Sequence, residues 1–123
     1  MAKRIFIVED DLDTQVVLVD CLDSFGYIVE PAADGTRAIA ACKRSDYAGM
    51  TLDIGLPDMS GLDVLKRVRI LKPRLPIIVI TGNVGCQQEV LREGAQAFLL
   101  KPFSRAELRA AVEEFIGPSS HLA

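Results

Sequence analysis

Apolar and polar residues follow two alternating patterns along this chain. Short, continuous apolar runs rich in Val and Ile are typical of strands covered on both faces. Between them lie longer stretches in which apolar residues recur every three or four positions, as on one face of a helix. The segments predicted as strands are 4–8, 27–32, 50–53, 76–80 and 97–100.

The first two predicted helices have local start and stop signals. Gly26 follows the first helix, residues 13–25, as a left-handed stop. Asp34-Gly35-Thr36 offers a turn and an N-cap for the second helix, over 37–45. The apolar stripe expected on the first helix consists of Val16, Val19, Leu22 and Phe25.

Capping signals also mark the later helices. Ser60 to Asp63 resembles a capping box, and Pro73 closes the helix that it opens. Residues 85–93 predict a short helix ended by Gly94. Ser104 to Glu107 is a full capping box for the last helix, whose stop is Gly117-Pro118.

Five strands alternating with five helices indicate an α/β fold, a doubly wound parallel sheet with right-handed crossovers and helices on both faces. In such sheets the ligand site lies beyond the carboxyl ends of the strands. Polar side chains stand at four of these ends. They are Glu9 and Asp10, Asp53, Thr81 and Lys101.

Length and composition predict one domain. A chain of 123 residues that is 50% hydrophobic can bury a core without disulfides or structural metals. We expect the domain to cover 1–118 and the last residues, 119–123, to form a disordered tail. The net charge of −3 argues against nucleic acid as a direct partner, because binding to the phosphate backbone needs a basic face.

Three cysteines without a CxxC pair indicate free thiols in a reducing compartment. The apolar run after Lys3 and Arg4 ends at three acids, too soon for a signal peptide or a membrane span. We therefore expect a cytoplasmic protein with no membrane partner.

The polar strand ends predict a magnesium site. Glu9, Asp10 and Asp53 would bring three carboxylates together, which costs on the order of several kcal/mol in a partly buried site unless a cation joins them. A site of oxygen ligands without His or Cys selects a hard cation such as Mg²⁺.

The same residues predict phosphoryl transfer. A divalent cation, the Lys101 ammonium and the Thr81 hydroxyl would offset charge on phosphoryl oxygens while the Asp53 carboxylate attacks in line. Gly82 leaves room for the backbone to approach the phosphate. This reasoning leads to an aspartyl phosphate.

With these motifs the sequence resembles the receiver domain of bacterial two-component response regulators over nearly its whole length. The resemblance implies a flavodoxin-like, chemotaxis-regulator-like fold with strand order 2-1-3-4-5. Any one motif is weak evidence, but their order along the chain is highly specific. The matching segments are Val8-Glu9-Asp10, Leu52 to Pro57 with Gly61 beyond it, Ile80-Thr81-Gly82 and Lys101-Pro102-Phe103.

The resemblance also implies residue roles. Asp53 would be the phosphoacceptor. Asp10 would ligate the metal directly, Glu9 would act through a bound water, and the backbone carbonyl of Gly55 would complete the protein ligands. Thr81 and Lys101 would contact the phosphoryl oxygens, while Thr81 and Phe98 would switch the surface around the fourth helix, fifth strand and fifth helix.

The implied partners are a histidine kinase or a histidine phosphotransfer protein as phosphodonor, and a downstream effector protein or domain. A phosphorylation-dependent homodimer is a further implied partner. No effector domain is recognisable in this sequence, so we expect a single-domain regulator or a receiver from a larger protein.

Three features depart from the family pattern. The stretch from Thr81 to Lys101 is about two residues short, roughly half a helical turn, so we expect a truncated or partly unwound fourth helix. Phe98 lacks the hydroxyl of a tyrosine, so its switching would depend on packing. Gly55 puts no side chain two positions after the acceptor, which would alter the phosphoryl lifetime.

Three other functions are compatible with parts of the sequence. Asp11-Leu12-Asp13 is the D-x-D of a haloacid-dehalogenase-type phosphatase, but Gln15 stands where that motif wants Thr or Val. A nucleotide-binding module would need glycines where the first turn has acids. A receiver-like interaction module that acts without phosphorylation is the remaining alternative.

Overall fold

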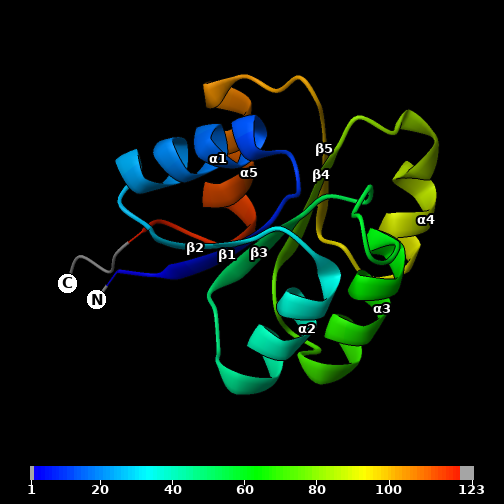
Figure 1. Ribbon diagram of the computed structural model, residues 1–123. Helices are drawn as coiled ribbons and strands as arrows, with labels where there is room; N and C mark the ends of the chain where they lie inside the picture. Colours follow the sequence, from blue (N-terminus) through cyan, green and yellow to red (C-terminus); the bar gives the residue numbers. More distant parts are fainter. Residues whose placement is uncertain (1, 120–123) are drawn as a thin grey trace.

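Strands and helices alternate along the chain in the computed structural model, which describes residues 2–119 (Figure 1). The strands are β1 (Arg4–Val8), β2 (Ile28–Ala32), β3 (Gly49–Leu52), β4 (Ile77–Thr81) and β5 (Ala97–Leu100). The helices are α1 (Leu12–Ser24), α2 (Gly35–Arg44), α3 (Gly61–Leu71), α4 (Gln87–Arg92) and α5 (Arg105–Phe115). Of the predicted tail, residues 120–123 lie outside the described residues. The Ser119 carbonyl accepts a hydrogen bond from the Lys3 N–H at 2.8 Å.

The five strands form one parallel sheet in the order β2-β1-β3-β4-β5. This confirms the doubly wound, flavodoxin-like fold. From β1 the chain first adds β2 on one side and then β3, β4 and β5 on the other. The loops after β1 and β3 therefore diverge, and such sheets bind ligands in the crevice between these loops.

Each face of the sheet has its own apolar cluster, as the alternation of side chains along a strand requires. On one face, Leu18 and Leu22 of α1 and Leu108 and Val112 of α5 pack against β1 and β4. On the other, residues of α2, α3 and α4 form the second cluster. Figure 1 shows α1 and α5 together on one side and α2, α3 and α4 on the other.

The predicted stripe on the first helix was partly wrong. Val16 is 57% exposed, whereas Leu18, which the stripe left out, is buried. Leu22 is buried as predicted. Leu18 and Leu22 are four residues apart and therefore lie on the same face of α1, and this is the face that packs against the sheet. The predicted stop at Gly26 is confirmed by its left-handed φ of 99°.

The second helix begins two residues earlier than predicted. Within the predicted turn Asp34-Gly35-Thr36, Asp34 is the N-cap, and its side chain accepts the N–H of Arg37 at 2.8 Å. A residue from another part of the chain, Asp58, accepts the N–H groups of Gly35 and Thr36 at 2.8 and 2.9 Å. These groups would otherwise have no partner at a helix start, so Asp58 extends α2 backward.

The segment between β4 and β5 contains little helix, as its short length predicts. A 3₁₀ turn, η1 (Val84–Cys86), leads into the six residues of α4. Only Val90 of α4 is buried. The capping box of α5 is confirmed, with Ser104 and Glu107 exchanging hydrogen bonds.

None of the described helices combines the length and apolar character needed to cross a membrane. Cys21, Cys42 and Cys86 are free thiols, as predicted.

Candidate functional site

Four strand ends meet at one edge of the sheet. Glu9 follows β1, Asp53 follows β3, Thr81 is the last residue of β4, and Lys101 follows β5. Because the strands are parallel and neighbouring, their carboxyl ends lie side by side. The structure thus brings together the side chains that the sequence predicted as one site.

Lys101 bridges the two buried acids. Its Nζ lies 2.8 Å from Glu9 Oε1 and donates a hydrogen bond to Asp53 Oδ2 at 3.1 Å. Glu9 and Asp53 therefore share the same ammonium group. The Glu9 side chain is 1% exposed. Two buried carboxylates with one ammonium between them can accommodate a further cation.

Glu9, Asp10 and Asp53 form a carboxylate cluster. One oxygen from each lies within 4.8 Å of the others. Glu9 and Asp53 are buried, whereas Asp10 is exposed at the mouth of the site. With only oxygen donors, and more negative charge than Lys101 alone offsets, these residues fit a hard divalent cation.

Burial raises the pKa of Glu9 to about 7, and the nearby Asp53 charge adds to this effect. Contact with Lys101 and the Asp11 N–H, which donates to Glu9 Oε2 at 3.2 Å, opposes the rise. The effect of desolvation on the Glu9 pKa is larger than the opposing effect of these two contacts. The Glu9 carboxylate is therefore electrostatically unfavourable until more positive charge arrives.

Asp53 is affected in the opposite direction. Burial alone would raise its pKa, but the charge and hydrogen bond of Lys101, the Gly55 N–H and the Thr81 hydroxyl hold the pKa below its ordinary value. Desolvation alone would lower the pKa of Lys101, but the hydrogen bonds and charges of Glu9 and Asp53 raise it above its ordinary value. Asp53 and Lys101 are therefore both charged at neutral pH.

The loop after β3 is held close to Asp53 by a glycine. A Cβ at Gly61 would lie 2.3 Å from the backbone oxygen of Asp53 and 2.5 Å from the Cα of Ile54, so only glycine fits. The Gly61 N–H donates to the Ile54 carbonyl at 2.8 Å. By contrast, a Cβ at Gly55 or Gly82 would meet no atom of the described residues within 4 Å.

Thr81 and Phe98 occupy adjacent strands. Thr81 is buried, and its hydroxyl oxygen accepts the Asn83 N–H at 3.3 Å. Phe98 is partly buried and packs against the cluster under α2, α3 and α4. The aromatic ring therefore lies on the side of the sheet that carries the short α4.

Two residues that sequence reasoning missed hold the site in place. Gln15 Nε2 donates to the Glu9 carbonyl at 3.0 Å, which fixes the loop carrying the acids. Asp58 ties the loop after Asp53 to the start of α2. Neither contact has a local sequence signal, because each joins residues in separate elements.

Asp11 has a structural role instead. Its carboxylate caps α1 by accepting the N–H of Thr14 at 3.0 Å and the Thr14 hydroxyl at 2.5 Å. These bonds hold the pKa of Asp11 below its ordinary value. An acid committed to a helix cap does not supply the nucleophile of the phosphatase alternative.

Comparison with known proteins decides the family. The family model described as the response regulator receiver domain matches residues 5–113. The chain belongs to the receiver domain family. It is therefore a phosphoacceptor signalling module of two-component systems, with an acidic cluster of Glu9, Asp10 and Asp53 at its site.

Curated relatives of this receiver domain are longer proteins. The transcriptional regulatory protein HprR of Escherichia coli is 35% identical over 111 residues, which is 89% of this chain and 49% of HprR. The C4-dicarboxylate transport transcriptional regulatory protein DctD of Rhizobium meliloti is 32% identical over 87% of this chain and 24% of DctD. The receiver thus spans about half of these relatives or less.

Solved receiver domains share the fold closely. The receiver domain of sensor histidine kinase PA1611 from Pseudomonas aeruginosa, with magnesium coordinated in its active site cleft, has a TM-score of 0.88 and 34% identity, covering 95% of this chain and 99% of that one. The response regulator TrrA from Thermotoga maritima, in complex with Mg²⁺-BeF, has a TM-score of 0.86 and 28% identity, covering 92% and 98%.

Proposed function

We propose that this receiver domain accepts a phosphoryl group on Asp53 in a Mg²⁺-dependent reaction. The observation that carries the proposal is the bridging of Glu9 and Asp53 by the single cation Lys101, within a cluster of three carboxylates. Relatives that hold Mg²⁺, or Mg²⁺ with BeF, support the metal.

The metal would be held by the acidic cluster. Asp10 and Asp53 would ligate Mg²⁺ directly, Glu9 would hold a ligating water, and the Gly55 carbonyl would complete the protein ligands. When bound, Mg²⁺ would supply positive charge against the phosphoryl oxygens. It would also offset the repulsion that raises the pKa of Glu9.

The chain's own residues would carry the transfer. A carboxylate oxygen of Asp53 attacks the phosphorus of a phosphohistidine in line, forming a P–O bond as the P–N bond breaks and the electron pair returns to the imidazole. Because its pKa is depressed, Asp53 is ionised for this attack. Lys101 and Thr81 would bind phosphoryl oxygens, and the space beside Gly82 would admit the phosphate.

Phosphorylation would then change the output surface. Thr81 would move toward the phosphoryl group, and Phe98 would turn inward from its partly buried position. The surface formed by α4, β5 and α5 would be reshaped. The single buried residue of α4 leaves that helix weakly anchored, which favours such a change.

The proposed partners follow from this chemistry. The phosphodonor is a histidine kinase or a histidine phosphotransfer protein. The output signal passes to an effector protein or domain. Phosphorylation would also promote a homodimer. We place these events in the cytoplasm.

The test is phosphorylation by acetyl phosphate, followed by intact-mass measurement. We expect one phosphoryl adduct in Mg²⁺ and none in chelator. Asp53→Asn should lose the adduct. Asp63→Asn, which changes an exposed acid of α3, should retain it.

An adduct of equal yield in Asp53→Asn, or one independent of Mg²⁺, contradicts the proposal. Absence of any adduct, with phosphohistidine donors as well as acetyl phosphate, would favour the interaction module that works without phosphorylation.

A further inference from the structure

The cations of this chain gather in one part of the sequence. Residues 35–76 contain 8 of the 14 Lys and Arg residues but only 4 of the 17 Asp and Glu residues. This segment therefore has a formal charge of +4, whereas the rest of the chain has −7. It comprises α2, β3 and α3, and both helices cover the same face of the sheet (Figure 1).

Most of these cations have no acidic partner among residues 2–119. Within the described residues, Arg37 and Lys72 pair with carboxylates, and the guanidinium of Arg69 donates mainly to backbone carbonyls. The other five are exposed, and no described carboxylate lies within 4.0 Å of them. They are Lys43, Arg44, Lys66, Arg67 and Arg74. Such a surface attracts an anionic partner.

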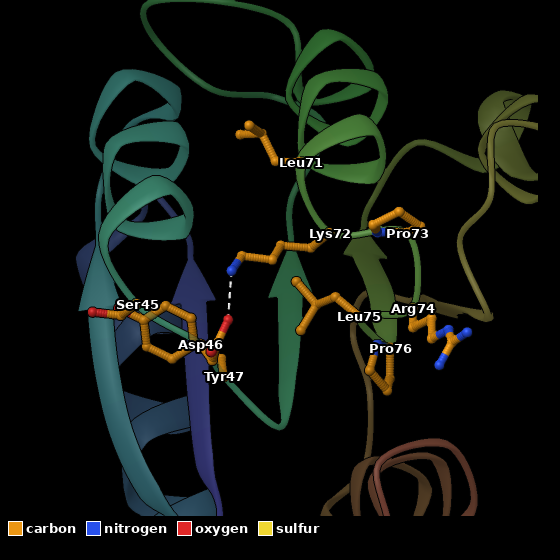
Figure 2. A pocket seen from close by; sticks show the side chains of 9 residues that line it. All are labelled: Ser45, Asp46, Tyr47, Leu71, Lys72, Pro73, Arg74, Leu75 and Pro76. Carbon is orange, nitrogen blue, oxygen red and sulfur yellow. Dashed lines mark hydrogen bonds and ion pairs between the residues drawn. The ribbon is translucent and has the colours of Figure 1, made fainter.

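A pocket with apolar walls lies at the lower end of this face. Its volume is about 390 Å³, and it is formed by 45–47, which precede β3, and 71–76, which precede β4. In Figure 2, Lys72 extends across it to pair with Asp46. Leu75 and Pro76 contribute apolar surface, and Arg74 stands beside them. The pocket therefore has room for an apolar side chain, and Arg74, whose guanidinium points away from the Lys72–Asp46 pair in Figure 2, adds a free positive charge beside it.

Exposed apolar residues extend the surface. Leu71 lines the pocket and is 38% exposed, and its neighbour Ile70 is 80% exposed. Between α2 and α3 lies another pocket, of about 290 Å³, where Ile39 and Met59 line the walls together with Lys43 and Arg67. Apolar lining and unpaired cations thus recur along the same face.

We propose that the α2–α3 face binds an acidic protein segment that inserts a large apolar side chain into the pocket between 45–47 and 71–76. The acidic residues of the segment pair with Arg74 and the neighbouring cations. A long polyanion such as nucleic acid fits less well, because the remaining −7 of the chain repels it and a phosphate backbone does not fill an apolar pocket.

This pocket and Asp53 lie at opposite ends of the strands. The pocket is built at the amino ends of β3 and β4, whereas the acidic site is at their carboxyl ends. Binding is therefore independent of the phosphorylation proposed above, and Asp53→Asn should bind the segment as the unaltered protein does.

The test is a titration of the ¹⁵N-labelled chain with the acetylated, amidated peptide EDFDELDE, followed by amide resonances. We expect saturable shifts at Ser45, Tyr47 and Leu75, with a dissociation constant below about 1 mM. Arg74→Glu should weaken binding by roughly three- to tenfold. The matched control, Arg92→Glu, alters an exposed arginine of α4 that lines neither pocket and should leave binding unchanged.

Three results would overturn the proposal. The first is equal binding of the peptide KKFKKLKK, in which lysines replace the acids. The second is the absence of saturable shifts at the pocket, or shifts confined to α1. The third is tighter binding of a single-stranded oligonucleotide than of the acidic peptide, which would make the face a nucleic-acid surface. Each of these is independent of acetyl phosphate labelling at Asp53.

Discussion

Lys101 donates a hydrogen bond to Asp53 at 3.1 Å, although the two residues are 48 positions apart in the sequence. The same ammonium lies 2.8 Å from Glu9, so one cation serves two buried acids. A single positive charge does not fully offset two buried negative charges. The excess negative charge of the metal-free site thus favours binding of a second cation.

Removing Lys101 should destabilise the metal-free protein. In Lys101→Gln the carboxylates of Glu9 and Asp53 lose their only charged partner among the described residues. We expect the free energy of unfolding in urea, measured in chelator, to fall by about 2 kcal/mol or more. Arg109→Gln breaks an exposed pair with Glu113 and should cost less than about 1 kcal/mol. Equal effects of the two substitutions would argue against the buried bridge.

The metal-free protein should become more stable as the pH falls from 8 toward 5. The folded pKa of Glu9, about 7, is above its ordinary value of 4.5, so the folded state takes up a proton before the unfolded state does. This stabilisation is complete below the unfolded pKa and is lost as the pH rises through 7. Urea unfolding at several pH values without Mg²⁺ measures it. Glu9→Gln should flatten the profile over this range, and a rise in stability from pH 5 to 8 would contradict the prediction.

Removing one acid should stabilise the metal-free protein and abolish Mg²⁺ binding. We expect a higher melting temperature in chelator for both Glu9→Gln and Asp10→Asn, with the larger rise for Glu9→Gln because Glu9 is buried and Asp10 is exposed. Thermal melts with and without Mg²⁺ compare the two. An unchanged or lowered melting temperature in chelator would count against repulsion within the cluster.

Gly61 and Gly55 should respond very differently to alanine. A Cβ at position 61 would collide with the backbone of Asp53 and Ile54, whereas a Cβ at position 55 would meet open space. We expect Gly61→Ala to lower the free energy of unfolding by about 1–3 kcal/mol and to slow acetyl phosphate labelling, because the acceptor must shift. Gly55→Ala serves as the control and should fold with nearly unchanged stability. A tolerated Gly61→Ala would show that the loop is not held tightly.

Asp58→Ala should loosen the start of α2. The Asp58 carboxylate accepts the Gly35 and Thr36 N–H groups and the Thr36 hydroxyl, and these bonds lower the pKa of Asp58 to about 2. Its contribution to stability is therefore present above pH 4 and lost as the pH falls toward 2. We expect a lower melting temperature at pH 7 for Asp58→Ala. The difference from the unaltered protein should disappear in strong acid, and a difference that persists there would rule out the ionised cap.

Local patterns along the sequence determined the order of elements and the residues at the strand ends. The apolar runs around β1 and β4 and the capping box at Ser104 depend on residues close together in the chain, so they were predicted within a few positions. Because parallel strands align their carboxyl ends, Glu9, Asp53, Thr81 and Lys101 could be assigned to one site without coordinates.

Only the tertiary structure decided the contacts that join separate elements. The inward turn of Leu18, the cap that Asp58 gives α2 and the bond from Gln15 to the Glu9 carbonyl have no signal in their own segments. The raised pKa of Glu9 likewise sums burial and charges contributed by several strands. Helix and strand preferences are short-range properties of the chain, whereas burial and electrostatics depend on which distant residues fold against each other.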